Sequence, residues 1–214
     1  MSDRDSEAVP QEGAGSSRPR SRRRWWILGG VLLAGASVYG VTWLRYPSDR
    51  TPEGAYLRIV TAVNRGRPEL FFAYTEEAAQ HACFTIRDYR RRALELIAES
   101  YPEPERAEWL ERYRALGEAP DGPDVFAHFA RERGWLDRLR RDMSGVQRVE
   151  ISGERATVET ARGTRYPFRR RPNGIWGTTL FTAALTTEAE RAARDLQLIE
   201  RAADDYRRAA SRAR

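Results

Sequence analysis

The stretch VQRVEISGERATVETARGTRYPFRRRPNGIWGTTLF, residues 146–181, has the most regular pattern in this sequence. Apolar and polar side chains alternate along it, which is typical of β-strands that are buried on one face. Three short segments with glycine interrupt the alternation and suit tight hairpin turns: Gly153-Glu154, Ala161-Arg162-Gly163 and Pro172-Asn173-Gly174. We therefore predict an antiparallel meander with strands at 146–152, 155–160, 164–171 and 175–181.

The same turns predict the register of the sheet. They place these residues opposite one another: Val149 and Val158, Ile151 and Ala156, Val158 and Tyr166, Ala156 and Phe168, Arg170 and Trp176, Tyr166 and Leu180. One face is then apolar apart from Arg170, and it is expected to be covered by helices. On the other face Glu159 lies between Arg148 and Arg165, which is a favourable cross-strand arrangement of charges.

Residues 51–143 carry the apolar period of several short helices. Thr51-Pro52-Glu53 begins the first helix with a capping hydroxyl, a proline and an acidic first turn, and Gly66 ends it. Thr85 and Asp88 resemble a capping box and predict another helix start there. The predicted fold class is therefore α+β, with helices packed on a curved antiparallel sheet of four or more strands.

A long helix is predicted for residues 186–214. Thr187 and Glu190 form a capping box at its start. Its apolar positions alternate spacings of four and three, as in a heptad seam: Leu185, Ala189, Ala192, Leu196, Ile199, Ala203, Tyr206 and Ala210. We expect this seam to contact the protein's own domain, and a partner helix is the alternative.

Residues 25–44, WWILGGVLLAGASVYGVTWL, contain no charged side chain. A helix of this length spans the hydrocarbon layer of a bilayer, which is about 30 Å thick. Trp25, Trp26 and Trp43 lie at its ends, where aromatic rings favour the membrane interface. We predict a transmembrane helix that contacts the lipid bilayer, with a polar, disordered cytoplasmic tail at 1–24 and a linker at 45–50.

The arginines predict the orientation of this helix. Five of them lie just before the apolar run, namely Arg18, Arg20, Arg22, Arg23 and Arg24, and fewer follow it. Because positive charge stays on the cytoplasmic side, we expect a single-pass protein of a bacterial inner membrane with a periplasmic domain. The alternative is a cleaved signal peptide, with an apolar core at 25–33 and cleavage near Ala34-Gly35-Ala36.

Composition bounds the class of partner. All 37 basic side chains are arginine, which is typical of a GC-rich genome. Without the six Arg and four acidic residues of 1–24, the rest of the chain has 31 Arg and 27 Asp or Glu, a net charge of +4. This interleaved balance is unlike the basic stripe of a nucleic-acid-binding protein, so no nucleic acid is expected as a partner. Cys83 is the only cysteine, so no intramolecular disulfide forms.

Residues 51–181 resemble the nuclear-transport-factor-2-like superfamily of small α+β cones, especially its membrane-anchored bacterial members. The matching segments are TPEGAYLRIVTAVNRGRPELFFAY at the start, and VQRVEISGERATVET and RRRPNGIWGTT at the end. The chain departs from that family by a helical insertion at about 90–142, by fewer clear strands and by the long C-terminal helix. The resemblance implies a cone-like domain at 51–185 with a pocket, and no particular activity, because the fold serves enzymes, binders and assembly domains.

Enzymes of that family often use an Asp–His pair inside the cone. The nearest substitute here is His128 with Asp88 or Asp137, which would serve a pocket-based hydrolase, dehydratase or isomerase. His81, Cys83 and His128 lack a metal-ligand spacing, so we expect neither a metal nor a cofactor.

The run Arg169-Arg170-Arg171 is the candidate contact site for a ligand or partner. Arg169 and Arg171 lie on the polar face and lack a cross-strand acid in the predicted register, so they can contact an anion or an acidic partner. Arg170 shares the apolar face with Trp176 and Tyr166, where a cation–π contact is expected. Because no catalytic motif is present, we favour a membrane-anchored periplasmic binding or scaffolding domain over an enzyme. Its partner is expected to be an envelope protein or a small ligand. The sequence specifies neither which of these it is nor the oligomeric state.

Overall fold

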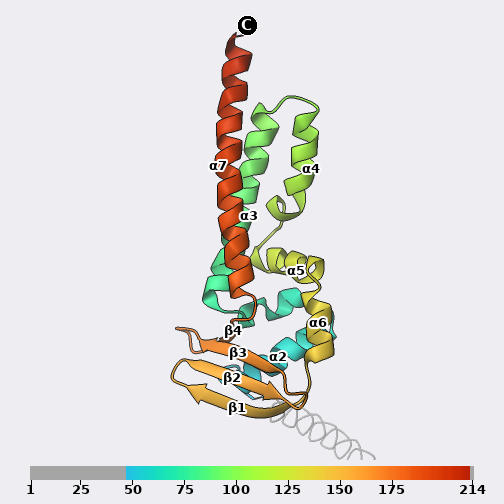
Figure 1. The fold of residues 1–214 in the computed structure, drawn as a ribbon, viewed down its shortest axis with the longest axis vertical. Coiled ribbons are helices and arrows are strands. Elements are labelled where there is room, and N and C mark those ends of the chain that lie inside the picture. The colour runs from blue at the N-terminus through green and yellow to red at the C-terminus, as the bar shows by residue number, and fades with distance from the viewer. Residues whose placement is uncertain (1–46, 213–214) are drawn as a thin grey trace, which may run out of the picture. The chain divides into compact units, whose positions relative to one another are not determined.

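The computed structural model of this chain describes residues 47–212 (Figure 1). The predicted tail at 1–24 and the predicted transmembrane segment at 25–44, with Trp25, Trp26 and Trp43, lie outside the described residues. Between residues 47 and 212, none of the helices combines the length and the apolar character that crossing a bilayer requires. The described residues form an α+β structure in which a four-stranded sheet lies at one end and long helices extend away from it.

The sheet is the predicted antiparallel meander, in the order β1-β2-β3-β4. Its strands are β1 (Val146–Ser152), β2 (Arg155–Thr160), β3 (Arg165–Arg170) and β4 (Trp176–Thr178). The predicted pairs of Val158 with Val149 and with Tyr166 are present, as is the pair of Arg170 with Trp176. Glu159 lies between Arg148 and Arg165 as predicted. The register therefore follows from the three turns, whose glycines Gly153, Gly163 and Gly174 all have positive φ.

Two residues of the predicted apolar face are exposed. Strand β4 ends at Thr178, so Leu180 does not pair with Tyr166 and is 46% exposed. The chain turns there into the last helix, and Phe181 is buried in place of Leu180. Ile151 is 60% exposed, because it lies near the end of the edge strand β1, where only β2 flanks it.

Helix α2 (Pro52–Asn64) covers the apolar face of the sheet. Its start is the predicted one, since the Thr51 hydroxyl accepts a hydrogen bond from the Gly54 N–H at 3.1 Å. Tyr56 and Ile59 are buried, and the Tyr56 ring lies 5.3 Å from that of Tyr166. A short 3-10 helix, η1 (Pro68–Tyr74), follows and adds Phe71 and Phe72 to the core.

The predicted helix start at Thr85 is wrong. Helix α3 (Glu77–Ser100) runs through this position without a break. Its buried residues recur with helical spacing on both sides of Thr85, and they include Cys83, Ile86 and Ala93. Burial of this continuous face outweighs a local capping signal, which contributes only about 1 kcal/mol.

Three shorter helices connect α3 to the sheet. They are α4 (Glu105–Gly117), α5 (Gly122–Glu132) and α6 (Trp135–Asp142). The Asp121 carboxylate caps α5 by accepting from the Gly122 N–H at 2.8 Å. Gly134, with a φ of 64°, makes the sharp turn between α5 and α6.

The last helix, α7 (Thr182–Arg212), lies along α3 (Figure 1). The predicted capping box is wrong, because α7 begins five residues before Thr187, and the Thr187 hydroxyl donates instead to the Ala183 carbonyl. The predicted seam does contact the protein's own domain, as Leu185, Ala192, Ile199 and Ala203 are buried. With residues of α3 and α4, its distal half forms a second hydrophobic cluster away from the sheet: Ala93, Leu96, Ile97, Tyr101, Tyr113, Ile199 and Ala203.

Candidate functional site

The apolar face of the sheet is filled by side chains. Tyr166, Phe168 and Trp176 are each at most 4% exposed. The Trp176 indole N–H donates to the Arg50 carbonyl at 3.1 Å, and burial raises the pKa of Tyr166. These aromatic residues are therefore part of the core and offer a ligand almost no surface. Of the predicted contact residues, Trp176 and Tyr166 are thus structural, whereas the arginines are at the surface.

Four arginines gather at one end of the sheet, and we call them the arginine cluster: Arg155, Arg169, Arg170 and Arg171. Arg155 begins β2 and lies directly opposite Arg169 on β3. Arg170 and Arg171 continue the chain from β3 toward the turn before β4. The β2–β3 hairpin thus brings together charges that are fourteen to sixteen residues apart in the sequence.

Arg169 forms an ion pair with an acidic residue that lies outside the sheet. Its Nη1 lies 2.7 Å from Oε1 of Glu76, the residue before α3, whose side chain is only 9% exposed. Oε2 of Glu76 accepts a hydrogen bond from the Thr182 hydroxyl at 2.7 Å. One nearly buried carboxylate thus joins β3 to the beginnings of α3 and α7.

Arg171 also contacts the start of α3. Its Nη1 donates to the Ala73 carbonyl at 2.7 Å, and its Nη2 donates to the Gln80 amide oxygen at 3.0 Å. This proximity depends on Gly177, because a Cβ at that position would lie 2.4 Å from the Thr75 carbonyl oxygen. The segment before α3 can therefore lie beside β4, where Thr75 and Thr178 form a parallel bridge.

Arg155 and Arg170 are exposed, and within residues 47–212 neither side chain has an acidic partner. The predicted cation–π contact between Arg170 and Trp176 is not formed among the described residues. Two arginines directly opposite one another repel, and Glu76 neutralises only one of them. Guanidinium groups bind carboxylates and phosphates through two parallel hydrogen bonds, so this end of the sheet can bind an anion.

Sequence reasoning found three members of the arginine cluster and missed Arg155, Glu76 and Gln80. The predicted register already implied the pair of Arg155 with Arg169. Nothing in the sequence indicated Glu76 or Gln80, since they lie more than ninety residues from Arg169 and Arg171.

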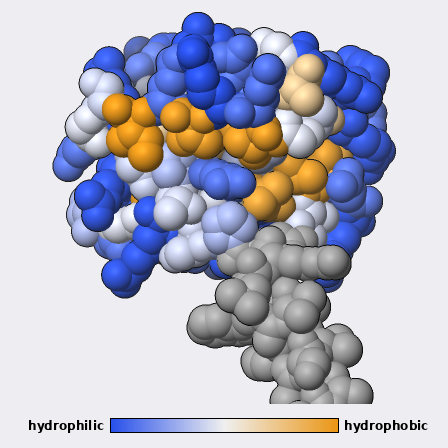
Figure 2. Space-filling view, turned by 90° about the horizontal axis from the view of Figure 1, so that it is seen from below, coloured by the Kyte–Doolittle hydropathy of each residue, from blue (hydrophilic) through white to orange (hydrophobic). Residues whose placement is uncertain are grey.

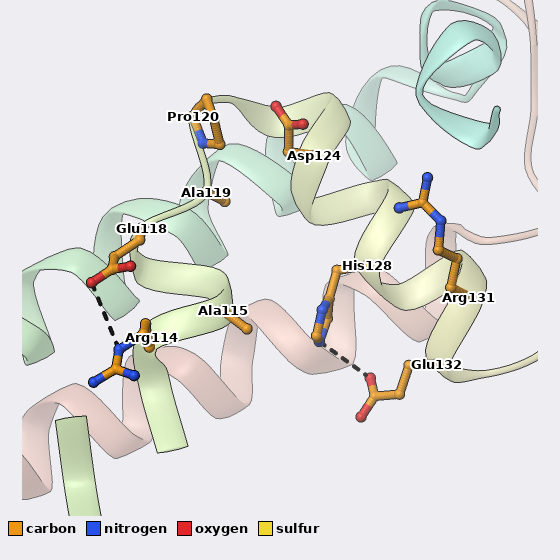
Figure 3. Close-up of a pocket in the computed structure, with 9 residues that line it drawn as sticks. All are labelled: Arg114, Ala115, Glu118, Ala119, Pro120, Asp124, His128, Arg131 and Glu132. Carbon is orange, nitrogen blue, oxygen red and sulfur yellow. Dashed lines mark ion pairs between the residues drawn. The ribbon is translucent and has the colours of Figure 1, made fainter. Parts of the chain in front are cut away.

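His128 lies in an open cavity of about 690 Å³ between the end of α4 and α5 (Figure 3). Its Nε2 is 3.7 Å from Oε2 of Glu132, one helical turn later on α5. The two acids proposed as its partners pair elsewhere, Asp88 with Arg87 at 2.9 Å and Asp137 with Arg140 at 3.3 Å. The cavity lining is of mixed charge: Arg114, Ala115, Glu118, Ala119, Pro120, Asp124, His128, Arg131 and Glu132. The geometry of His128 and Glu132 is that of a surface ion pair on a helix.

The remaining candidates for metal or nucleophilic chemistry are separate from one another. His81 pairs with Glu77 at 3.6 Å on the exposed side of α3. Cys83 is fully buried, and burial raises the pKa of its thiol to about 12. In the part of the chain that the structure describes, no group of three or more His, Cys, Asp or Glu side chains could hold a metal ion.

The described residues thus define an α+β domain with a closed sheet face and an arginine cluster at one end of the sheet. Comparison with protein-family models, with curated proteins and with solved structures gives no match to this chain. The resemblance to the nuclear-transport-factor-2-like superfamily stays a prediction.

Proposed function

We propose that this chain is a membrane-anchored binding or scaffolding protein of the bacterial envelope. Residues 25–44 span the inner membrane, residues 1–24 stay in the cytoplasm, and the following domain lies in the periplasm. The arginine cluster binds an acidic segment of a partner protein. The α2–η1–α3 segment before the meander also supports a distant relationship to the nuclear-transport-factor-2-like superfamily.

The observation that supports binding most directly is the charge at the end of the sheet. Arg155 and Arg169 face one another across β2 and β3, and exposed Arg170 follows. Within residues 47–212, Arg169 alone of these three is paired with an acid, Glu76, and both oxygens of that carboxylate already accept hydrogen bonds. A carboxylate from another molecule would relieve the repulsion and bind Arg155 and Arg170.

Reporter fusions test the topology. A reporter that works only in the periplasm, fused after residue 60, should be active, whereas a cytoplasmic reporter at the same position should be silent. Activity of the cytoplasmic reporter alone would contradict both the orientation and the location.

Site-specific photo-cross-linking in native membranes tests the binding surface. A photo-reactive residue at position 170 should form one discrete protein adduct, and the same residue at exposed position 91 on α3 should not. Arg155→Glu should lower the adduct yield because it repels the acidic segment, and added salt should do the same. Arg91→Glu is the matched control, since Arg91 is also exposed and has no acidic partner among the described residues. An adduct of equal yield in the Arg155→Glu protein would refute the assignment.

A further inference from the structure

A second basic site lies between α2 and η1. We propose that this cavity binds the phosphate of an anionic phospholipid headgroup at the membrane surface. The inference rests on the membrane anchor in the proposed function and is independent of the arginine cluster.

The cavity has a volume of about 300 Å³ and these lining residues: Arg58, Thr61, Ala62, Arg65, Leu70 and Tyr74. Arg58 lies on α2 and Arg65 is the residue that caps its C-terminal end, seven positions later, so both lie on one side of the helix about 10 Å apart along its axis. Arg65 is exposed and has no acidic partner in residues 47–212. The nearby Arg67, by contrast, pairs with Glu69 at 2.8 Å. Arg65 is therefore the cation that remains available to an incoming anion.

Apolar surface adjoins these charges. Leu70, on the cavity wall, is 40% exposed. On the same helix Leu57 and Val60 are only partly buried. Figure 2 shows bands of apolar residues across the hydrophilic surface on the side of the domain where β1 lies. Arginine beside exposed apolar side chains suits the boundary between phosphate headgroups and acyl chains, and suits a soluble phosphate ion less well.

The covalent chain keeps this cavity close to the proposed membrane span. Arg58 Nη1 donates to the Pro47 carbonyl at 2.8 Å, so the cavity lies beside the first described residue. Only Arg45 and Tyr46 separate Pro47 from Leu44, the last residue of the apolar run. Three Cα–Cα steps reach at most about 11 Å. If residues 25–44 span the bilayer, this short connection leaves Arg58 within reach of the headgroups.

Asp49 is an opposing charge that contacts the cavity lining. Its carboxylate hydrogen-bonds with Tyr74, and Arg58 also lies next to that tyrosine, with its guanidinium carbon 6.0 Å from the ring centroid. Asp49 therefore offsets Arg58, and the net positive charge of the site depends on Arg65. Removing the Asp49 charge should strengthen lipid binding.

Native mass spectrometry of the full chain in detergent measures this site. The protein is incubated with phosphatidylglycerol and phosphatidylcholine that carry the same acyl chains. We expect preferential retention of phosphatidylglycerol by the native protein. Arg65→Gln should lower that retention about fivefold, because one basic residue near an anionic membrane surface raises the affinity by about that factor. Asp49→Asn should increase retention. Arg91→Gln on α3, an equally exposed arginine, should leave it unchanged.

The outcomes separate the lipid site from the anchor. Equal retention by Arg65→Gln and the native protein would overturn the lipid site alone. Displacement of the lipid by excess inorganic phosphate would also overturn it and would assign the site to free phosphate. Alkaline carbonate extraction of cell membranes tests the anchor separately. Release of the chain into the soluble fraction would overturn both the anchor and this inference.

Discussion

Arg90 of α3 and Asp195 of α7 form an ion pair in which Nη2 lies 2.7 Å from Oδ2. The Arg90 side chain is 8% exposed, and its guanidinium carbon lies 4.3 Å from the centroid of the Tyr113 ring on α4. Nε and Nη1 of Arg90 have no hydrogen-bond partner among the described residues. One cation therefore links three helices at the point where the main core gives way to the second hydrophobic cluster.

Asp195→Ala should destabilise the fragment 47–214 by about 3 kcal/mol, because it leaves the Arg90 charge buried and unpaired. The described part of this fragment belongs to one compact unit, so chemical denaturation can measure the change. The double variant Arg90→Met with Asp195→Leu should recover most of the loss, since an apolar pair of similar volume needs no counter-ion. A double variant no more stable than Asp195→Ala would show that the ion pair itself is required.

Trp176→Ala should cost about 3–5 kcal/mol, because it removes a buried aromatic ring and the indole hydrogen bond to Arg50. Arg169→Ala should cost about 1–2 kcal/mol, since it leaves the nearly buried Glu76 carboxylate without its cation. Arg148→Ala is the control on the same sheet, and it should change stability by less than about 0.5 kcal/mol, as its side chain is 61% exposed. Equal losses for the two arginine variants would argue against a structural role of the Glu76 contact.

Ile199→Asp should lower the stability of the same fragment by several kcal/mol, because it places a charge among buried residues of α3 and α7. Leu198→Asp, one position away and 58% exposed, is the matched control and should have almost no effect. Sedimentation of the native fragment should show a monomer at all concentrations. A native dimer that becomes a stable monomer in Ile199→Asp would instead indicate that the seam binds a second chain.

Stability should fall as the pH rises from about 9 toward 12. The pKa of Cys83 is raised from 9.0 to about 12 in the folded protein, so the unfolded chain loses this proton first. The contribution of the buried Cys83 thiol to the free energy of unfolding is fully present below pH 9. It is lost as the pH rises from 9 to the folded-state pKa, with a slope of at most about 1.4 kcal/mol per pH unit. Burial also raises the pKa of Tyr56 and Tyr166, which extends the loss above pH 10.

Cys83→Ala should flatten the stability curve between pH 9 and 10, before tyrosines ionise. Urea denaturation at a series of pH values measures this slope. The native thiol should also react slowly with a disulfide reagent at pH 8, and rapidly after unfolding, because the thiolate is the reactive form. Fast reaction of the folded protein would contradict the burial of Cys83.

The sequence alone was sufficient for the sheet register, because hairpin turns and side-chain alternation act between residues a few positions apart. The pairing of Val158 with Tyr166 and the position of Glu159 between two arginines follow from the turns. The apolar seam of α7 also followed from spacing, since residues three and four apart share one helix face.

Tertiary structure alone decided where the helices begin and which charges are paired. Local capping signals at Thr85 and Thr187 were overridden, because burying continuous faces of α3 and α7 contributes more free energy than one cap. Arg169 looked unpaired along its strand, and its partner Glu76 comes from 93 residues away. Such contacts depend on how the start of α3 lies against β4, which no spacing in the sequence encodes.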